Sequence, residues 1–205
     1  MSRTVTGLTQ AEGRGFLPPL GFRDDCVVTL NPGMKFKYRY DDGDASDEYS
    51  LQVESVGETV RYRWQLEGCP DSGEIQLTAS SIAKPIGMIW FSQGAVTAGH
   101  EEVVQARDAT VTVDGYLPPF SSSPWDESGS LELQVNYQSV VLERTDDFEG
   151  VEVQVAGAAV QIQGRIWRSA DEESYLVVSQ DDRAPGVLQA SFDGGTVELD
   201  LLSVD

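Results

Sequence analysis

The sequence predicts an all-β protein whose antiparallel meander forms a closed or half-open barrel. Apolar and polar residues alternate along several short runs, the pattern of strands with one buried face. Turn-forming residues separate these runs by about eight to twelve residues, as they do in barrels and sandwiches. Only residues 101–107 (EEVVQAR) resemble a helix, and they are too few for two full turns. Little or no helix is therefore expected, and a sandwich is the alternative architecture.

The chain has 205 residues, enough for one well-buried domain. Residues 1–25 are rich in Gly and Pro and lack periodicity, which predicts an irregular arm. Residues 26–205 are assigned to a single β domain. Within that domain, residues 115–129 (GYLPPFSSSPWDESG) are expected to form one long loop.

The first three strands of the domain carry the clearest alternation. They are expected at residues 35–40, 48–54 and 60–66, joined by turns around Gly43 and Gly57. Their polar faces are basic, acidic and basic in turn: Lys35, Lys37 and Arg39, then Glu48 and Glu54, then Arg61 and Arg63. Unlike charges opposite each other stabilise neighbouring strands, so the three strands predict a solvated ladder of ion pairs.

The later strands follow from the same reasoning. Strands are expected at residues 26–30, 74–79 and 109–113, and one strand is expected to run from 130 to 142. Residues 145–150 are expected to turn the chain, and Ala156-Gly157 to make a tight turn between residues 151–155 and 160–166. Residues 175–178 are apolar on both faces, as a central strand would be, and residues 187–192 and 196–202 form a final hairpin.

Charge and composition limit the classes of partner. The formal net charge of -20 disfavours nucleic acid and anionic membranes, and it favours solubility, a basic partner or a salt-rich habitat. No run approaches the length of a membrane span. No signal peptide is visible, so the sequence predicts a cytoplasmic protein, or an envelope protein if a leader has been removed. Cys26 and Cys69 could pair or stay as free thiols.

Residues that could carry catalysis are sparse. His100 is the only histidine and has no second histidine at metalloprotease spacing. The turn that begins at Asp42 resembles the start of a calcium loop, but it lacks the glycine and the glutamate that such a loop needs. Nucleophile-elbow and phosphate-loop motifs are both missing. The sequence therefore predicts a protein that is not an enzyme and that needs no cofactor or metal.

One apolar face is unusually aromatic. It is expected to carry six aromatic residues on the first three strands: Phe36, Tyr38, Tyr40, Tyr49, Tyr62 and Trp64. Because Tyr and Trp have polar tips, this face is either a packed core whose hydroxyls reach the rim or a pocket for an apolar or amphipathic ligand. In the second case Tyr116, Phe120 and Trp125 of the long loop would form its rim.

Two segments resemble a known family. Residues 30–40 (LNPGMKFKYRY) and the tail GRIWRSADEESYLVVSQ with LQASFDGGTVELDLLSV are similar to the opening and closing strands of bacterial half-barrel proteins related to the lipoprotein-localisation factors. The resemblance covers less than half of the chain. It implies a curved antiparallel sheet that binds apolar ligands or lipoprotein tails on its concave face.

These observations predict a non-enzymatic module that binds an apolar small molecule or a protein partner through its aromatic face. The alternative is an acidic inhibitor, immunity-type or assembly protein whose negative surface docks a basic protein partner.

Overall fold

The computed structural model describes residues 3–6, 27–41, 43–44, 46–57, 59–68, 72–78, 101–106, 109–114, 120–125, 129–135 and 138–205. Most of these residues are in extended strands, as the sequence predicts. In the ranges given, no α-helix occurs, and the one helical segment is the three-residue 3-10 turn η1 (Asp193–Gly195). The all-β prediction is therefore confirmed.

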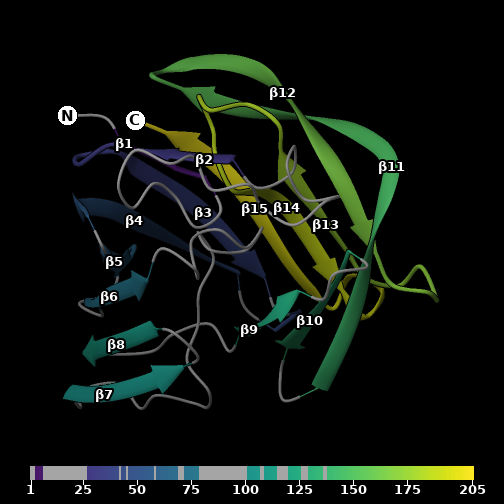
Figure 1. Cartoon of the computed structure of the whole chain (residues 1–205), viewed down its shortest axis with the longest axis horizontal. Helices are drawn as coiled ribbons and strands as arrows, with labels where there is room; N and C mark the ends of the chain where they lie inside the picture. Colours follow the sequence, from purple (N-terminus) through teal and green to yellow (C-terminus); the bar gives the residue numbers. More distant parts are fainter. Residues whose placement is uncertain are drawn as a thin grey trace.

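Among the described residues, thirteen strands form a single sheet built from two groups (Figure 1). In sheet order, the first group consists of β7 (Glu101–Ala106), β8 (Ala109–Asp114), β6 (Ser72–Thr78), β5 (Thr59–Leu66), β4 (Ser46–Val56) and β3 (Lys35–Asp41). The second consists of β15 (Val197–Val204), β14 (Val187–Phe192), β13 (Tyr175–Ser179), β12 (Ala158–Arg168), β11 (Gln138–Val155), β10 (Ser130–Val135) and β9 (Phe120–Trp125). Antiparallel pairing of β3 with β15 joins the two groups.

Part of the sheet closes on itself. Strands β11 to β15 pair in sequence, and β15 then pairs back onto β11 in parallel through Gln154↔Ser203 and Val155↔Val204. This closure makes a partial ring of five strands. The open sheet continues from β15 through β3 to β8 on one side and from β11 through β10 and β9 on the other. Of the closed or half-open barrel expected from the sequence, the structure has the half-open form, with a partial ring of five strands.

The pairing of β3, β4 and β5 confirms the predicted ladder of charges. Lys37 Nζ lies 2.6 Å from a Glu48 carboxylate oxygen, and Arg63 pairs with Glu54 at 2.6 Å. The ladder also extends to strands that the sequence did not identify as partners, because Arg39 pairs with Asp200 of β15 at 2.5 Å and Arg61 pairs with Glu74 of β6.

Reversing the charge of Lys37 should weaken this ladder. Lys37→Glu places a carboxylate beside Glu48 and Glu67, whose oxygens lie 2.6 and 3.1 Å from the present ammonium. We expect it to lower the free energy of unfolding by about 1 kcal/mol at low salt and by less at high salt, since these groups are exposed. Urea titration at two salt concentrations measures this. Lys35→Glu, opposite Gln52, makes the same change in net charge, and an equal loss there would contradict the pairing argument.

Four sequence-based assignments need correction. Residues 101–106 form strand β7 and not a helix, because a helix this short is marginal in water while its two adjacent valines favour a strand paired with β8. The expected long loop at 115–129 contains strand β9, the last strand in the sheet order, where Pro124 is tolerated as an edge residue. Residues 115–119 lie outside the described residues.

The other two corrections concern β11. The single strand expected over 130–142 is a hairpin, in which Val135 of β10 pairs with Gln138 of β11. The turn expected at 145–150 is instead an irregularity within one continuous strand, because Thr145, Asp146 and Asp147 lie where the register against β12 shifts. A cluster of polar residues thus predicted a reversal of the chain where the strand only bulges.

In the predicted arm, strand β1 (Arg3–Thr6) pairs with β2 (Val27–Leu30) in a separate two-stranded sheet. The assignment of residues 1–25 to an arm otherwise stays a prediction. The predicted turn at Ala156-Gly157 is confirmed, since these two residues have φ values of 48° and 78° between the paired Val155 and Ala158.

Candidate functional site

The six aromatic residues identified from the sequence come together on one face of β3, β4 and β5. Register places Tyr38 opposite Tyr49, while Leu51 lies opposite both Phe36 and Trp64. Tyr62 lies opposite Val53. We call the set Phe36, Tyr38, Tyr40, Tyr49, Tyr62 and Trp64 the aromatic face. Each of the six is at most 5% exposed, so any ligand of this face must be taken into the interior.

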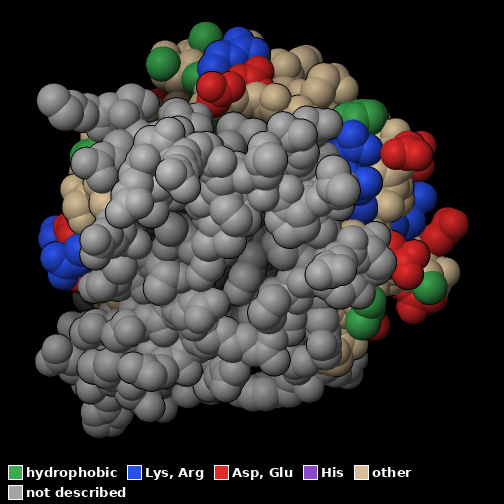
Figure 2. Space-filling view, viewed as in Figure 1, with side chains coloured by type: hydrophobic (Ala, Val, Ile, Leu, Met, Phe, Trp, Pro, Cys, Tyr) green, Lys and Arg blue, Asp and Glu red, His purple; other side chains and the backbone are tan. Residues whose placement is uncertain are grey.

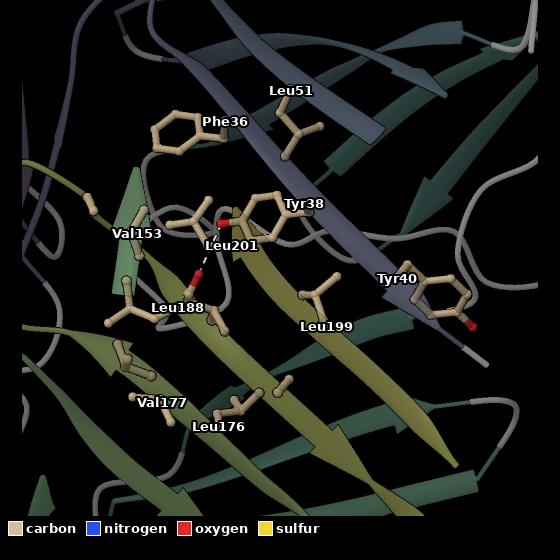
Figure 3. Close-up of a cluster of buried hydrophobic side chains, with 14 of the residues drawn as sticks. Phe36, Tyr38, Tyr40, Leu51, Val153, Leu176, Val177, Leu188, Leu199 and Leu201 are labelled. Atoms are coloured by element: carbon tan, nitrogen blue, oxygen red, sulfur yellow. Dashed lines mark hydrogen bonds between the residues drawn. The ribbon is translucent and has the colours of Figure 1, made fainter. Parts of the chain in front are cut away.

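Tyr38 ties the aromatic face to the second group of strands. Its hydroxyl donates a hydrogen bond to the Val187 carbonyl oxygen of β14 at 3.1 Å, and Figure 3 shows this bond reaching past Leu201 of β15. Its ring also stacks on Tyr49, with centroids 5.6 Å apart and planes 19° from parallel. The polar tip of Tyr38 is therefore satisfied by the fold itself.

Tyr49 and Trp64 differ from Tyr38 in this respect. The Tyr49 hydroxyl and the Trp64 indole N–H are both buried, and neither has a hydrogen-bond partner in the part of the chain that the structure describes. They lie on adjacent strands and are diagonal neighbours, since Tyr49 pairs with Leu66 and Trp64 pairs with Leu51. Diagonal neighbours on one face are close enough for aromatic side chains to share a small molecule.

Burial also changes the acidity of the tyrosines. The pKa values of Tyr38, Tyr49 and Tyr62 are all raised above the ordinary value of 10.0, mainly because the buried site disfavours the charged phenolate. The Tyr49 pKa is raised further by the neighbouring Tyr38 and Tyr40. The interior beside the aromatic face thus disfavours negative charge.

These shifts predict an alkaline transition. A folded-state pKa above the unfolded value means that the full stability is present below about pH 10 and is lost as pH rises further. Each tyrosine contributes a slope of up to about 1.4 kcal/mol per pH unit, so urea titrations from pH 9 to 11 should show a steep decline. The phenolate absorbance near 295 nm should rise together with unfolding.

Tyr49→Phe should remove about one third of the slope that comes from these three tyrosines. If all three ionised near pH 10 in a protein that stays folded, their burial would have no energetic consequence and this expectation would be wrong.

The residues expected to form a rim are not placed beside the aromatic face by sheet pairing. Tyr116 lies outside the described residues. Phe120 and Trp125 begin and end β9, which stands at the far end of the sheet order from β4 and β5. Their role at a rim stays a prediction.

The second group of strands supplies the rest of this interior, and sequence reasoning missed one of its contacts, the hydrogen bond from Tyr38 to Val187. Leu199 and Leu201 of β15 lie opposite Tyr40 and Tyr38, and Leu188 of β14 is fully buried with them (Figure 3). The alternation in residues 197–201 does identify Leu199 and Leu201 as core residues. The use of the Val187 carbonyl as an acceptor leaves no signal in the sequence, because every residue has a carbonyl.

Other candidate residues give no second site. His100, Cys26 and Cys69 lie outside the described residues. Among the residues that are described, no group of three or more His, Cys, Asp or Glu side chains is arranged to hold a metal ion. Within the same residues, no helix is long and apolar enough to cross a membrane.

Comparison of the chain with protein-family models, curated proteins and solved structures finds no significant match.

Proposed function

We propose that this protein is a non-enzymatic binding module that takes up an apolar or amphipathic small molecule against its aromatic face. The observation that carries the proposal is the pair of buried polar groups, Tyr49 Oη and Trp64 Nε1, without hydrogen-bond partners among the described residues. A buried polar group that lacks a partner costs about 1–3 kcal/mol, and native proteins keep few of them. A ligand that supplies the missing partner would recover that cost.

The chemistry of the two groups narrows the ligand. An indole N–H only donates, so the ligand needs an acceptor for Trp64, while the Tyr49 hydroxyl can donate or accept. A fully ionised carboxylate is disfavoured in a site that raises tyrosine pKa values. We therefore expect an apolar body with a neutral acceptor, such as an ester, ketone or alcohol oxygen. The resemblance to half-barrel proteins that bind apolar ligands supports the same class.

Two conservative variants should move stability in opposite directions. Tyr49→Phe removes an unpaired buried hydroxyl, so we expect the ligand-free protein to become more stable by about 1 kcal/mol. Tyr38→Phe removes the donor to Val187, so we expect a loss of about 1 kcal/mol. Urea titration measures both. Destabilisation by Tyr49→Phe equal to that by Tyr38→Phe would show that the Tyr49 hydroxyl is already satisfied.

Ligand uptake itself is tested with Nile red, a neutral apolar dye that carries a carbonyl acceptor. We expect saturable binding to the folded protein, displacement by dodecanol, and weaker displacement by dodecanoate at neutral pH. Tyr49→Phe and Trp64→Phe should each weaken binding about fivefold to tenfold, the value of one hydrogen bond. Tyr175→Phe, on β13 and away from the aromatic face, is the matched control.

Nile red binding that is indifferent to both aromatic-face variants, or no binding of neutral amphiphiles at all, would overturn the proposal. The second candidate function is the docking of a basic protein partner by this acidic protein. The exposed edge of strand β11 is the feature that favours this function.

A further inference from the structure

The middle of β11 has an open edge. On the side away from β12, β10 pairs with β11 as far as Glu143, and β15 pairs with it again only at Gln154 and Val155. Between these points, no strand in the described ranges pairs with residues 145–153 on that side. Figure 1 shows β11 and β12 as long, curved ribbons at the border of the molecule.

The hairpin geometry identifies which backbone groups are open. In a two-residue hairpin the flanking residues, here Val155 and Ala158, form a hydrogen-bonded pair, and such pairs alternate along the ladder. Phe148, Gly150 and Glu152 therefore direct their N–H and C=O groups away from β12. Gln154 is the next residue in this alternating series. Its backbone pairs with β15, as expected for a residue whose N–H and C=O groups point away from β12.

An exposed aromatic side chain stands at one end of this edge. Phe148 is 49% exposed and, with Val141, is one of two large hydrophobic residues exposed in the described part of the chain. The Arg165 guanidinium lies over its ring, 4.5 Å from the centroid, and donates to the Thr145 carbonyl oxygen at 3.0 Å. Phe148 is thus held in place by its neighbours while half of its surface faces solvent.

The charges beside this edge select the kind of partner. β11 contains five acidic residues and one arginine. Asp147, Glu149 and Glu152 are exposed and have no ion-pair partner among the described residues, although Asp146 pairs with Arg165 at 3.4 Å. Figure 2 shows acidic and basic side chains along the border of the molecule where this hairpin lies. A second copy of the chain would bring the same carboxylates together, so self-pairing along this edge is disfavoured.

We propose that the open edge of β11 from Phe148 to Glu152 accepts an extended segment of a basic partner protein by strand addition. The outward N–H and C=O groups of Phe148, Gly150 and Glu152 supply the ladder, and Phe148 packs against an apolar side chain of the segment. Because Glu152 and Glu149 point to opposite faces of the strand, the segment carries Lys or Arg on both of its faces. This inference rests on the edge alone and is independent of the aromatic face.

A fluorescein-labelled peptide of sequence KKVKVKK tests the proposal by fluorescence anisotropy. We expect it to bind and to weaken with added salt, and we expect the matched EEVEVEE peptide not to bind. The decisive comparison uses two variants that remove the same charge. Glu152→Gln keeps the outward N–H, whereas Glu152→Pro removes it and places a ring in the path of the added strand.

We expect Glu152→Pro to weaken binding at least tenfold relative to Glu152→Gln, and Phe148→Ala to weaken it several-fold relative to wild type. The Glu152→Pro and Glu152→Gln variants should both stay folded, because the Glu152 N–H is not part of the β11–β12 ladder. Equal binding by the Pro and Gln variants would overturn the proposal, as it would show attraction by charge without strand addition. Failure of the basic peptide to bind the wild-type protein would overturn it as well.

Discussion

Replacing Gly164 with valine should lower the free energy of unfolding by about 3 kcal/mol or more. Gly164 lies in β12 between Glu149 and Ser179 on the neighbouring strands. A Cβ at this position would lie 2.5 Å from Val177 Cγ1 and 3.0 Å from both Leu188 Cδ1 and the Val178 carbonyl oxygen. The backbone oxygen cannot move without disturbing the ladder, so a side chain of any size forces the strands apart.

A second glycine on the paired strand provides the control for this prediction. A Cβ on Gly150 would meet the Gln163 Nε2 atom at 2.8 Å and the Gln161 Oε1 atom at 3.2 Å. Both atoms are the far ends of exposed, flexible side chains that can turn away. We therefore expect Gly150→Ala to change stability by less than about 1 kcal/mol and Gly164→Ala to cost clearly more. Urea titration compares them directly, and equal losses would contradict the packing argument.

Shortening the side chain that a Cβ at position 164 would meet should restore part of the loss. In Gly164→Ala combined with Val177→Ala, the new methyl group occupies space that the valine vacates. The double variant should then lose less than the sum of the two single losses. Strict additivity would show that the contact between these two positions does not cause the effect.

The two glycines show how far sequence reasoning reaches. Alternation along 35–40, 48–54 and 60–66 predicts strands correctly, because each has one buried face that fixes its register. The same rule locates the buried Val197, Leu199 and Leu201. The different packing of Gly150 and Gly164 is not visible in the sequence, since both lie among alternating residues. It depends on which side chains the neighbouring strands place over each one.

The errors along β11 have an identifiable physical source. The apolar residues 131, 133 and 135 are odd-numbered, whereas the apolar residues 140 and 142 are even-numbered. That change of phase is the signal of the hairpin, in which Leu131 pairs with Leu142 and both are fully buried. At Thr145 to Asp147 polarity alone predicted a turn, but Thr145 Oγ1 donates to the Ile166 carbonyl oxygen at 2.8 Å and keeps the bulged strand against β12.

The candidate site could likewise be predicted from the sequence only in part. Sequence periodicity places six aromatic residues on one face, and the structure has all six there. Which of their polar tips find partners could not be predicted, because Tyr38 is satisfied by a carbonyl on a strand about 150 residues later in the chain. The distinction between Tyr38 and Tyr49, on which the proposed function rests, is therefore a property of the tertiary fold.

Placing an aspartate at Val204 should destabilise the protein by about 3–5 kcal/mol at neutral pH. Val204 is buried at the point where the five-stranded ring closes, between Phe36 of β3 and Val155 of β11. Its carbonyl oxygen also accepts a hydrogen bond from the Ala156 N–H at 2.9 Å. A carboxylate there has to be buried without a partner or has to pull β15 away from β11. We expect hydrogen exchange of the Ala156 amide to accelerate as the ring opens.

The pH dependence of this loss separates charge from shape. Burial raises the pKa of the introduced aspartate above its unfolded value near 3.9, so its neutral form is favoured at low pH and the penalty grows as pH rises. The free energy of unfolding of Val204→Asp should therefore be closer to that of wild type at pH 5 than at pH 8, while Val204→Asn should lose the same amount of stability at both pH values.

Ser203→Asp, on the adjacent residue and opposite Lys37, should cost less than about 1 kcal/mol, because its carboxylate has a cation across the strand. An equally small loss at positions 203 and 204 would mean that the end of β15 frays without consequence for the ring. The closure would then hold the five strands less tightly than its burial and its hydrogen bond to Ala156 require.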